Sequence, residues 1–452
     1  MRMTLRDIGR MAGVEVDSGF SVEGVCTDTR NLRQGMLFFA LTGLHEDGHR
    51  YVAEAVAKGG AAVADPARLP SGLPAERILP CRDPLQALQR LASRYRDRFT
   101  IPVLAVTGTN GKTTTKEMIA AVLGKKYRTA KTAGNLNNHI GLPLSICAWE
   151  SGIQAAVLEL GINHAGEMKT LCGIARPTHG LITNIGKGHL EFFGSMEGVA
   201  RAKAELLEAL SPPGLAILNG DDPFLIPYRH VAPVTRTFGF SSGCDFTGRL
   251  REEAGFPILE MEGGPIRLKT FGMHQAANAL AAAAVGRLFD VEWSLIVQAL
   301  EAFEPADGRG EWLRFGDVLV LKDTYNANPS SMEAALAALL SFPGLARRAA
   351  VLGDMLELGE SCRPEHEKLG ERIARSGLQA FFSTGSGMRH AAEQALRAGM
   401  KAAHHYDAID TLNASVSAWL KPGDGLLVKG SRGMRMERVV EHLARRPNER
   451  KE

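Results

Sequence analysis

Short runs of apolar residues that end in glycine or polar residues recur along this chain of 452 residues. The clearest series lies in the middle of the sequence, at residues 101–106 (IPVLAV), 154–160 (QAAVLEL), 178–186 (THGLITNIG) and 214–222 (GLAILNGDD). Short apolar runs bounded by turn residues are typical of buried strands, and helical patterns between several of them indicate parallel pairing. The pattern therefore predicts an α/β fold with a doubly wound, mostly parallel sheet, in which ligands bind beyond the carboxyl ends of the strands.

The pattern changes on either side of this series. Before it, the strand signals VEGVCTD, MLFFALTG and GAAVADP accompany helical spacing at residues 51–58 and 84–99, and the proline-rich residues 69–84 are expected to form a loop. After the glycine-rich residues 304–310, a third series comprises DVLVLKD, RRAAVLGDM, QAFFSTG and DGLLVKG. We therefore expect three domains: a small α/β domain at residues 1–98, the central sheet at residues 99–309, and a Rossmann-like α/β domain at residues 310–452.

The segment after the first central strand combines glycine, lysine and threonine. Residues 107–115 read TGTNGKTTT, and the helical pattern KEMIAAVL follows. Backbone N–H groups at such a helix N-terminus attract anions, Lys112 adds a cation, and the Thr113 hydroxyl can ligate Mg²⁺. This segment predicts a phosphate-binding loop, a variant of the P-loop in which Val106 stands at the usual first glycine and Gly108 makes the early turn. The alternative is a strand-to-helix turn with a solvated first turn.

Other polar residues follow the predicted strands. Glu159 ends the second central strand, where it can ligate Mg²⁺ or simply face solvent, and its place beside the phosphate loop favours the metal. His189, after the third strand, can bind a second metal or be a surface histidine. His274 and Asn278 share one face of an alanine-rich helix, and Asn278 can bind a ligand or cap its own helix. Nothing in composition or spacing distinguishes Lys203 from other helix-surface lysines.

Composition excludes several classes of function. The 53 basic and 50 acidic residues leave a net charge of only +3, and no dense basic run with aromatic residues supports nucleic-acid binding. The 6 cysteines contain no CxxC pair, which argues against zinc ribbons and disulfide frameworks. No export signal and no apolar run of membrane-spanning length is found. We therefore expect a soluble cytoplasmic protein.

Taken together, these motifs resemble the Mur ligase family of ATP-dependent amino-acid ligases. TGTNGKTTT, LEL, HLEFFGS, NGDDP and HQAANALAAAA follow in the family's order across the whole chain. Within the family, GNLNNHIG, TYNANPSSM, LGDMLELG and VKGSRGMRME resemble the member that adds D-alanyl-D-alanine. The Asp-Asn-Pro-Arg signature of the neighbouring member, which adds the third amino acid, is not found here.

The resemblance implies an activity in peptidoglycan precursor synthesis. The chain would join D-alanyl-D-alanine to the terminal carboxylate of UDP-N-acetylmuramoyl-tripeptide through an acyl phosphate, using ATP and two Mg²⁺ ions. It also implies carbamylation of Lys203, and we expect a monomer. Our own hypothesis is that the third domain closes over the second at a hinge near residues 305–310. Two alternatives stay open: a sister ligase that adds a single amino acid, as in folate polyglutamylation, and a non-catalytic protein that binds a cell-wall precursor together with a nucleotide.

The resemblance further implies residue roles. The catalytic residues would be Lys112, Glu159, His189 and Lys203. Metal ligands would be Thr113, Glu159, His189 and Lys203. ATP contacts would come from Thr107, Gly108, Thr109, Asn110, Gly111, Lys112, Thr113, Thr114, Asn278, Arg309, Asp323 and Asn326. Contacts with the muramoyl substrate would come from Thr27, Asp28, Thr29, Arg30, Thr42, Asn135, Asn137 and Asn138.

Three positions depart from the expected family pattern. Gln275 replaces a more usual asparagine, which preserves the amide and changes its reach. Lys322 and Thr324 stand where an aspartate and a serine are common, and Lys322 puts an extra cation near the nucleotide edge.

Overall fold

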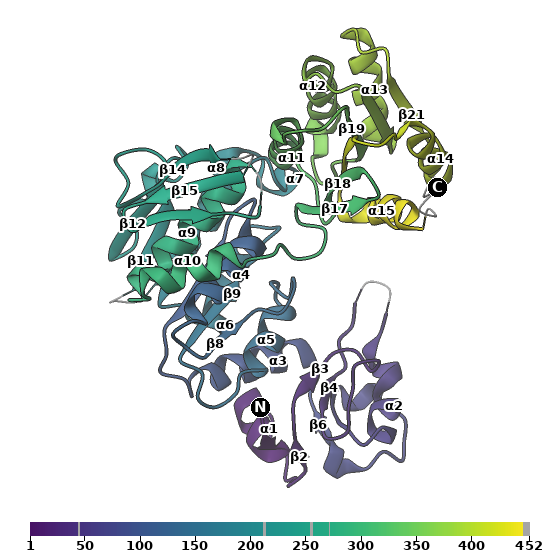
Figure 1. The fold of residues 1–452 in the computed structure, drawn as a ribbon. Helices are drawn as coiled ribbons and strands as arrows, with labels where there is room; N and C mark the ends of the chain where they lie inside the picture. The colour runs from purple at the N-terminus through teal and green to yellow at the C-terminus, as the bar shows by residue number, and fades with distance from the viewer. Residues whose placement is uncertain (44–45, 211–213, 254–255, 271, 446–452) are drawn as a thin grey trace.

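The computed structural model describes residues 1–43, 46–210, 214–253, 256–270 and 272–445. Figure 1 shows three bodies in chain order, coloured purple, blue to green, and green to yellow. They are called here the N-terminal, central and C-terminal units, after the four-, seven- and six-stranded sheets that they contain. Each sheet lies within one of the proposed domain ranges 1–98, 99–309 and 310–452, whereas residues 307–309 are bonded to the C-terminal unit.

The N-terminal unit is built on a parallel four-stranded sheet in the order β3-β4-β5-β6. One strand corrects the sequence analysis, because β6 (Ile78–Pro80) lies inside the expected loop 69–84 and pairs with β5. Three residues that end in proline are too short to show strand periodicity, and proline is tolerated here at the sheet edge. The other elements are α1 (Leu5–Ala12), β3 (Val25–Cys26), β4 (Leu37–Phe39), α2 (Val52–Ala57), β5 (Ala61–Ala64) and α3 (Pro84–Arg96).

The central unit contains a seven-stranded sheet in the order β13-β12-β11-β10-β7-β9-β8, with every pairing parallel. A separate antiparallel sheet, β14-β15-β16, follows it in the chain. The strands are β7 (Val103–Thr107), β8 (Thr129–Lys131), β9 (Ala155–Glu159), β10 (His179–Ile182), β11 (Leu215–Asn219), β12 (Val234–Gly239), β13 (Phe246–Thr247), β14 (Arg249–Glu253), β15 (Phe256–Met261) and β16 (Gly264–Arg267).

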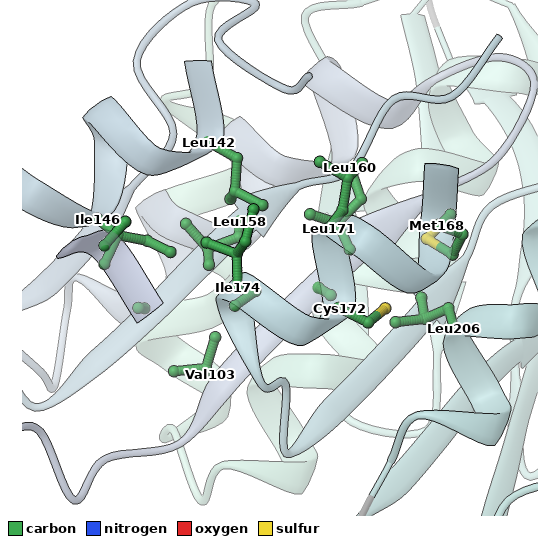
Figure 2. Packing of buried hydrophobic residues seen from close by; sticks show 14 of the residues in the cluster. Val103, Leu142, Ile146, Leu158, Leu160, Met168, Leu171, Cys172, Ile174 and Leu206 are labelled. Atoms are coloured by element: carbon green, nitrogen blue, oxygen red, sulfur yellow. The ribbon is translucent and has the colours of Figure 1, made fainter. Parts of the chain in front are cut away.

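Helices cover both faces of the central sheet, as the sequence predicted. Along β7, Val103 and Ala105 enter one apolar core while Leu104 and Val106 enter the other, because successive strand side chains point to opposite faces. Figure 2 shows side chains of the first core gathered around Val103 and Leu158. The first core involves α3, α5 (Gly141–Cys147), α6 (Glu167–Ala175) and α8 (Met196–Glu208), and the second involves α4 (Lys112–Leu123), α9 (Met273–Leu288) and α10 (Trp293–Glu301).

The C-terminal unit is also an α/β layer structure. Its sheet has the order β17-β18-β22-β19-β20-β21, in which β17 pairs antiparallel with β18 and the other pairings are parallel. The strands are β17 (Glu311–Phe315), β18 (Val318–Asp323), β19 (Arg348–Gly353), β20 (Ala380–Thr384), β21 (Ala403–Tyr406) and β22 (Gly425–Lys429). The helices are α11 (Pro329–Ser341), α12 (Cys362–Arg375), α13 (Ser386–Arg397), α14 (Ile409–Trp419) and α15 (Glu437–Ala444).

The connection between the central and C-terminal units is fastened to the C-terminal side. Gly310 N donates to Lys322 O at 3.1 Å, Tyr325 N donates to Gly308 O at 3.1 Å, and Lys322 forms an ion pair with Asp307. These bonds make residues 307–310 part of the C-terminal unit. Across the described residues, the helices are too short or too polar to cross a membrane.

Candidate active site

The strand order of the central sheet decides where the site lies. Because β7 lies between β10 and β9, the loop after β7 emerges between the carboxyl ends of its two neighbours. A cavity of about 570 Å³ opens there, and residues of the central and C-terminal units line it together. This volume is within the range of small-molecule sites.

The predicted phosphate loop is held against the end of β10. Thr109 N donates to Asn184 O at 2.9 Å, and Asn110 N donates to Asn184 Oδ1 at 3.0 Å. Gly108 packs so closely that a Cβ on it would lie 1.9 Å from Thr183 Oγ1. This close approach explains why a glycine stands at 108. The sequence analysis did not select Thr183 and Asn184, although polar residues directly after a buried strand are a signal for such a site.

Lys112 and Thr113 open helix α4 at the edge of the cavity. Lys112 Nζ donates to the carbonyl oxygens of Gly108 at 2.9 Å and Thr109 at 3.0 Å, so its charge lies over the loop. Burial lowers the pKa of Lys112, while the negative charge of Glu159 opposes that shift. Thr114 also lines the cavity, and the Thr107 hydroxyl donates to Leu160 O at 2.8 Å.

Glu159 lies beside the phosphate loop, as the sequence predicted. It pairs in register with Val106 on β7 and is only 1% exposed. The Thr113 hydroxyl donates to its Oε2 at 2.8 Å, and Asn137 Nδ2 donates to its Oε1 at 2.7 Å. A buried carboxylate therefore joins the phosphate-loop side of the cavity to the segment that carries Asn137.

Asn278 is tied to the helix that follows the phosphate loop. The Thr115 hydroxyl donates to Asn278 Oδ1 at 3.1 Å, and Asn278 Nδ2 donates to Gln275 Oε1 at 3.3 Å. The side chain of Gln275, which is longer than that of the more usual asparagine, thus reaches Asn278. A Cβ on Gly111 would lie 2.4 Å from Asn278 Oδ1, so this glycine leaves room for Asn278.

A pair of matched glycine variants tests this packing. Gly111 and Gly166 both precede a helix at similar positive φ angles, +78° and +82°, yet a Cβ on Gly166 would meet nothing within 4 Å. We expect Gly111→Ala and Gly166→Ala each to lose about 1–2 kcal/mol of stability through backbone strain. Only Gly111→Ala also displaces Asn278 beside the predicted phosphate loop, so we expect it alone to weaken binding of ADP, used as a phosphate-bearing probe, by about tenfold or 1.4 kcal/mol. Urea unfolding and calorimetric ADP titration measure the two effects; equal ADP affinities would contradict the expectation.

The C-terminal unit closes the far side of the cavity. Arg309 lies 3.7 Å from the centroid of the Tyr325 ring, and Asp323 Oδ2 lies 2.5 Å from Lys429 Nζ. Lys429 Nζ also donates to the carbonyl oxygen of Asn326 at 2.8 Å. All five of these residues line the cavity. The structure therefore brings the predicted residues Arg309, Asp323 and Asn326 together with the phosphate loop.

One further contact joins a C-terminal residue to the phosphate loop, whereas Lys322 lies outside the cavity. Asn328 Nδ2 donates to Asn110 Oδ1 at 2.8 Å, which joins the phosphate loop directly to the start of α11. Lys322, the unexpected cation, forms ion pairs with Asp307 and with Glu311 at 3.8 Å. Its charge is therefore balanced within the C-terminal unit.

His189 and Lys203 occupy different positions relative to the cavity. His189 lines it, and His189 Nδ1 lies 2.6 Å from Glu357 Oε2 of the C-terminal unit. This histidine lowers the pKa of Glu357. Lys203, on α8, is 2% exposed and does not contribute to the cavity lining. Burial, followed by the charge of Lys112, lowers the pKa of Lys203 well below its ordinary value.

The predicted substrate residues fall into two groups. Asn137 and Asn138 line the cavity, whereas Asn135 does not. Residues 27–30 and Thr42 lie in the N-terminal unit, outside this cavity. Three of these side chains already have partners: Arg30 is paired with Asp28 at 2.6 Å, and Thr42 Oγ1 accepts from Arg68 at 3.0 Å.

Two family models match the chain. The Mur ligase middle domain matches residues 106–286, and the Mur ligase, glutamate ligase domain matches residues 308–432. Both matches fall on units that line the cavity.

Known proteins resemble the chain over nearly its whole length. It is 37% identical to UDP-N-acetylmuramoyl-tripeptide--D-alanyl-D-alanine ligase of Bacillus subtilis (strain 168), covering 94% of each chain. It superposes on MurF from Acinetobacter baumannii with a TM-score of 0.88, 31% identity and 99% coverage of both chains. For MurF ligase from Thermotoga maritima in complex with ADP, the TM-score is 0.82 and the identity 30%, covering 94% of this chain and 97% of that one.

Proposed function

Because the chain belongs to the Mur ligase family, we propose that it is an ATP-dependent ligase that joins D-alanyl-D-alanine to UDP-N-acetylmuramoyl-tripeptide. The observation that carries this proposal is the cavity in which the phosphate loop, Glu159 and the C-terminal residues Arg309 and Asp323 face one another. Relatives that match over nearly the whole length bear the name of this activity. Matches of this extent favour it over a sister ligase that adds one amino acid.

The residues beside the phosphate loop fit a magnesium ion. Thr113 and Glu159 present hydroxyl and carboxylate oxygens 2.8 Å apart, which are the hard donors that Mg²⁺ takes. No group of three or more His, Cys, Asp or Glu side chains with metal-site geometry occurs within the described part of the chain. This agrees with Mg²⁺, which usually keeps several waters and binds substrate phosphates together with one or two carboxylates.

A second ion would use His189. A ligating histidine usually has a carboxylate at its other ring nitrogen, which fixes the tautomer and leaves one nitrogen for the metal. Glu357 Oε2 lies 2.6 Å from Nδ1 of His189 as an ion-pair partner, although Nδ1 makes no hydrogen bond in the structure. Burial lowers the pKa of Lys203 and so favours its neutral amine, which is the form that reacts with carbon dioxide to give an anionic carbamate. We therefore propose that His189 and carbamylated Lys203 serve this ion.

The proposed reaction has two steps, formation of an acyl phosphate and its attack by an amine. A carboxylate resists attack by an amine because its leaving group would be oxide, so transfer of the ATP γ-phosphoryl group to the tripeptide carboxylate forms an acyl phosphate and releases ADP. The amine of D-alanyl-D-alanine then attacks the carbonyl carbon, loses a proton, and expels phosphate. Lys112 and the backbone N–H groups at the start of α4 stabilise the charge on the transferring group. A bound Mg²⁺ would supply further positive charge to the transferring phosphoryl group.

The remaining predicted residues take positioning roles in this proposal. Arg309, Asp323, Asn326 and Asn278 orient the nucleotide across the cavity. Thr27, Asp28, Thr29, Arg30 and Thr42 bind the uridine diphosphate part of a substrate long enough to reach from the N-terminal unit. Asn135, Asn137 and Asn138 contact its muramoyl-peptide part. We also propose that the enzyme acts as a monomer.

Contact between the central and C-terminal units excludes water from the acyl phosphate. The ion pair between Lys187 Nζ and Glu365 Oε1, at 2.8 Å, joins the two units. Since residues 307–310 are bound to the C-terminal unit, we place the hinge before Asp307.

Removing Lys187 tests the inter-unit contact. We expect Lys187→Ala to lower kcat/KM about threefold to tenfold, because a half-exposed ion pair contributes little stability and 0.5 M salt screens it. The matched control is Lys368→Ala, since Lys368 Nζ lies 3.1 Å from the same Glu365 oxygen but within one helix. Steady-state kinetics at low and high salt measure the difference. Equal losses in the two variants would show that the contact between units does not matter.

Phosphate release tests the function itself. The purified protein is incubated with ATP, Mg²⁺ and UDP-N-acetylmuramoyl-tripeptide, with and without D-alanyl-D-alanine, and the product is weighed by mass spectrometry. Release that requires the dipeptide, with a product heavier by one dipeptide unit, supports the ligase. Turnover with a single amino acid instead would assign the protein to a sister ligase. ADP binding without any turnover would favour a precursor-binding protein.

A further inference from the structure

Lys116 is a completely buried lysine that the proposed mechanism does not use. It is 0% exposed and lies one helical turn after Lys112 on α4. Burying an ammonium group costs much free energy unless the group is paired and hydrogen-bonded. The groups that contact the Lys116 ammonium therefore indicate which role offsets the cost of its burial.

The Lys116 ammonium lies at the meeting point of two backbone carbonyls and two carboxylates. Nζ donates to Thr132 O at 2.7 Å and to Gly134 O at 3.0 Å. It also lies 2.9 Å from Glu117 Oε1 and 3.9 Å from Glu159 Oε2. Burial alone would raise the pKa of Glu117, but its contacts with Lys131 and Lys116 lower that pKa overall. A negative charge therefore stays beside Lys116.

The segment that accepts these bonds also holds Glu159. Glu159 N donates to Thr132 Oγ1 at 3.0 Å, and Gly161 N donates to the carbonyl oxygen of Asn137 at 2.9 Å. Asn137 in turn donates to Glu159 Oε1. Residues 132–137 are thus fastened to the end of β9, and Lys116 fastens the same segment to α4.

We propose that Lys116 is a positioning residue that joins the nucleotide side of the cavity to the side that binds the muramoyl-peptide, the acyl donor. Its helix begins at the phosphate loop, and the backbone it holds leads directly to Asn135, Asn137 and Asn138. Loss of its charge would release residues 132–138 and leave Glu159 with fewer fixed partners. The inference deepens the proposed ligase function and rests on it.

Separate binding measurements test this role. We expect Lys116→Met to weaken binding of UDP-N-acetylmuramoyl-tripeptide about tenfold, whereas the dissociation constant of ADP changes less than about threefold, because Lys112 and residues 107–113 stay in place. Lys116→Arg, which keeps the charge and the donors, restores most of the substrate affinity. Calorimetric titration of each ligand gives both constants, and steady-state kinetics give the matching rise in the substrate KM.

The matched control is Lys126→Met. Lys126 Nζ also donates to two backbone carbonyls, those of Asp290 at 2.7 Å and Phe289 at 3.5 Å, but it lies outside the cavity. This variant is expected to keep both affinities. If Lys116→Met weakens both ligands equally, or neither, the proposed coupling is wrong.

A second variant and a ligand-free measurement keep the test decisive. If Lys116→Met does not fold, Glu117→Gln removes the nearest counter-charge. We expect this variant to weaken binding of the tripeptide substrate about threefold with unchanged ADP affinity.

In ligand-free protein, amide hydrogen exchange at residues 132–138 should become faster in the Lys116 variant, while exchange in β7 stays slow. Unchanged exchange overturns the anchoring role. Because exchange needs no substrate, a wild-type protein without ligase turnover would refute the proposed function and leave this test intact.

Discussion

Replacing Lys112 with methionine is expected to lower kcat/KM by about 10³- to 10⁴-fold, or about 4–5.5 kcal/mol of transition-state stabilisation. Lys112 Nζ lies over the phosphate loop, bound to the carbonyl oxygens of Gly108 and Thr109. Methionine fills similar space without a charge, so the negative charge on the transferring phosphoryl group loses its nearest protein cation. Phosphate release at saturating dipeptide measures the loss.

The control for this variant is Lys125→Met. Lys125 follows the other end of α4 and donates to Gln298 Oε1 at 2.9 Å, away from the cavity. Its activity is expected to stay near the wild-type value, and neither variant should change the melting temperature by more than a few degrees. Activity of Lys112→Met within tenfold of wild type would contradict the proposed role of Lys112.

Replacing Lys203 with methionine should abolish most activity without loss of stability. We expect kcat to fall about 10²- to 10³-fold, because an uncharged thioether cannot become the proposed carbamate anion. The melting temperature should equal or exceed that of the wild type, since methionine occupies the buried position without the cost of a desolvated amine. Steady-state kinetics and thermal unfolding measure the two effects.

Two observations decide whether the carbamate explains the loss at Lys203. Wild-type protein in ¹³C-bicarbonate should give a carbamate carbon signal that is missing from Lys203→Met. Lys203→Glu, which supplies a permanent anion on a similar stem, should recover part of the lost activity. A wild-type protein without that signal, together with an inactive Lys203→Glu, would exclude carbamylation as the role of this lysine.

Much of the fold was predictable because its signals are local. Apolar runs of strand length with intervening helices predicted the doubly wound central sheet, and the alternation of Val103 to Val106 between two cores is the physical reason why β7 appears as a continuous apolar run. The strand β6 was missed because three residues that end in proline carry no periodicity of their own. Pairing with β5 creates this strand, and pairing is a tertiary property.

Local sequence signals also identified one part of the candidate site, whereas tertiary packing decided the rest. Glycines, a lysine and threonines between a strand and a helix identify the phosphate loop, and the parallel strand arrangement brings Glu159 to the same edge. No local pattern distinguishes Lys116 or Lys203 from solvated helix lysines, nor indicates that Glu357 lies against His189. These relations depend on which helices and loops pack together.

The sequence by itself determined the division into three α/β parts, the parallel central sheet, the phosphate loop and the family resemblance, because these follow from periodicity and from short motifs. Tertiary structure alone decided the partners across the cavity: Asn110 with Asn328, Glu159 with Asn137, and Lys187 with Glu365. The physical reason is that hydrogen bonds and ion pairs act over a few ångströms. Groups that are distant along the chain meet only once the sheets and their connections have set the distances between them.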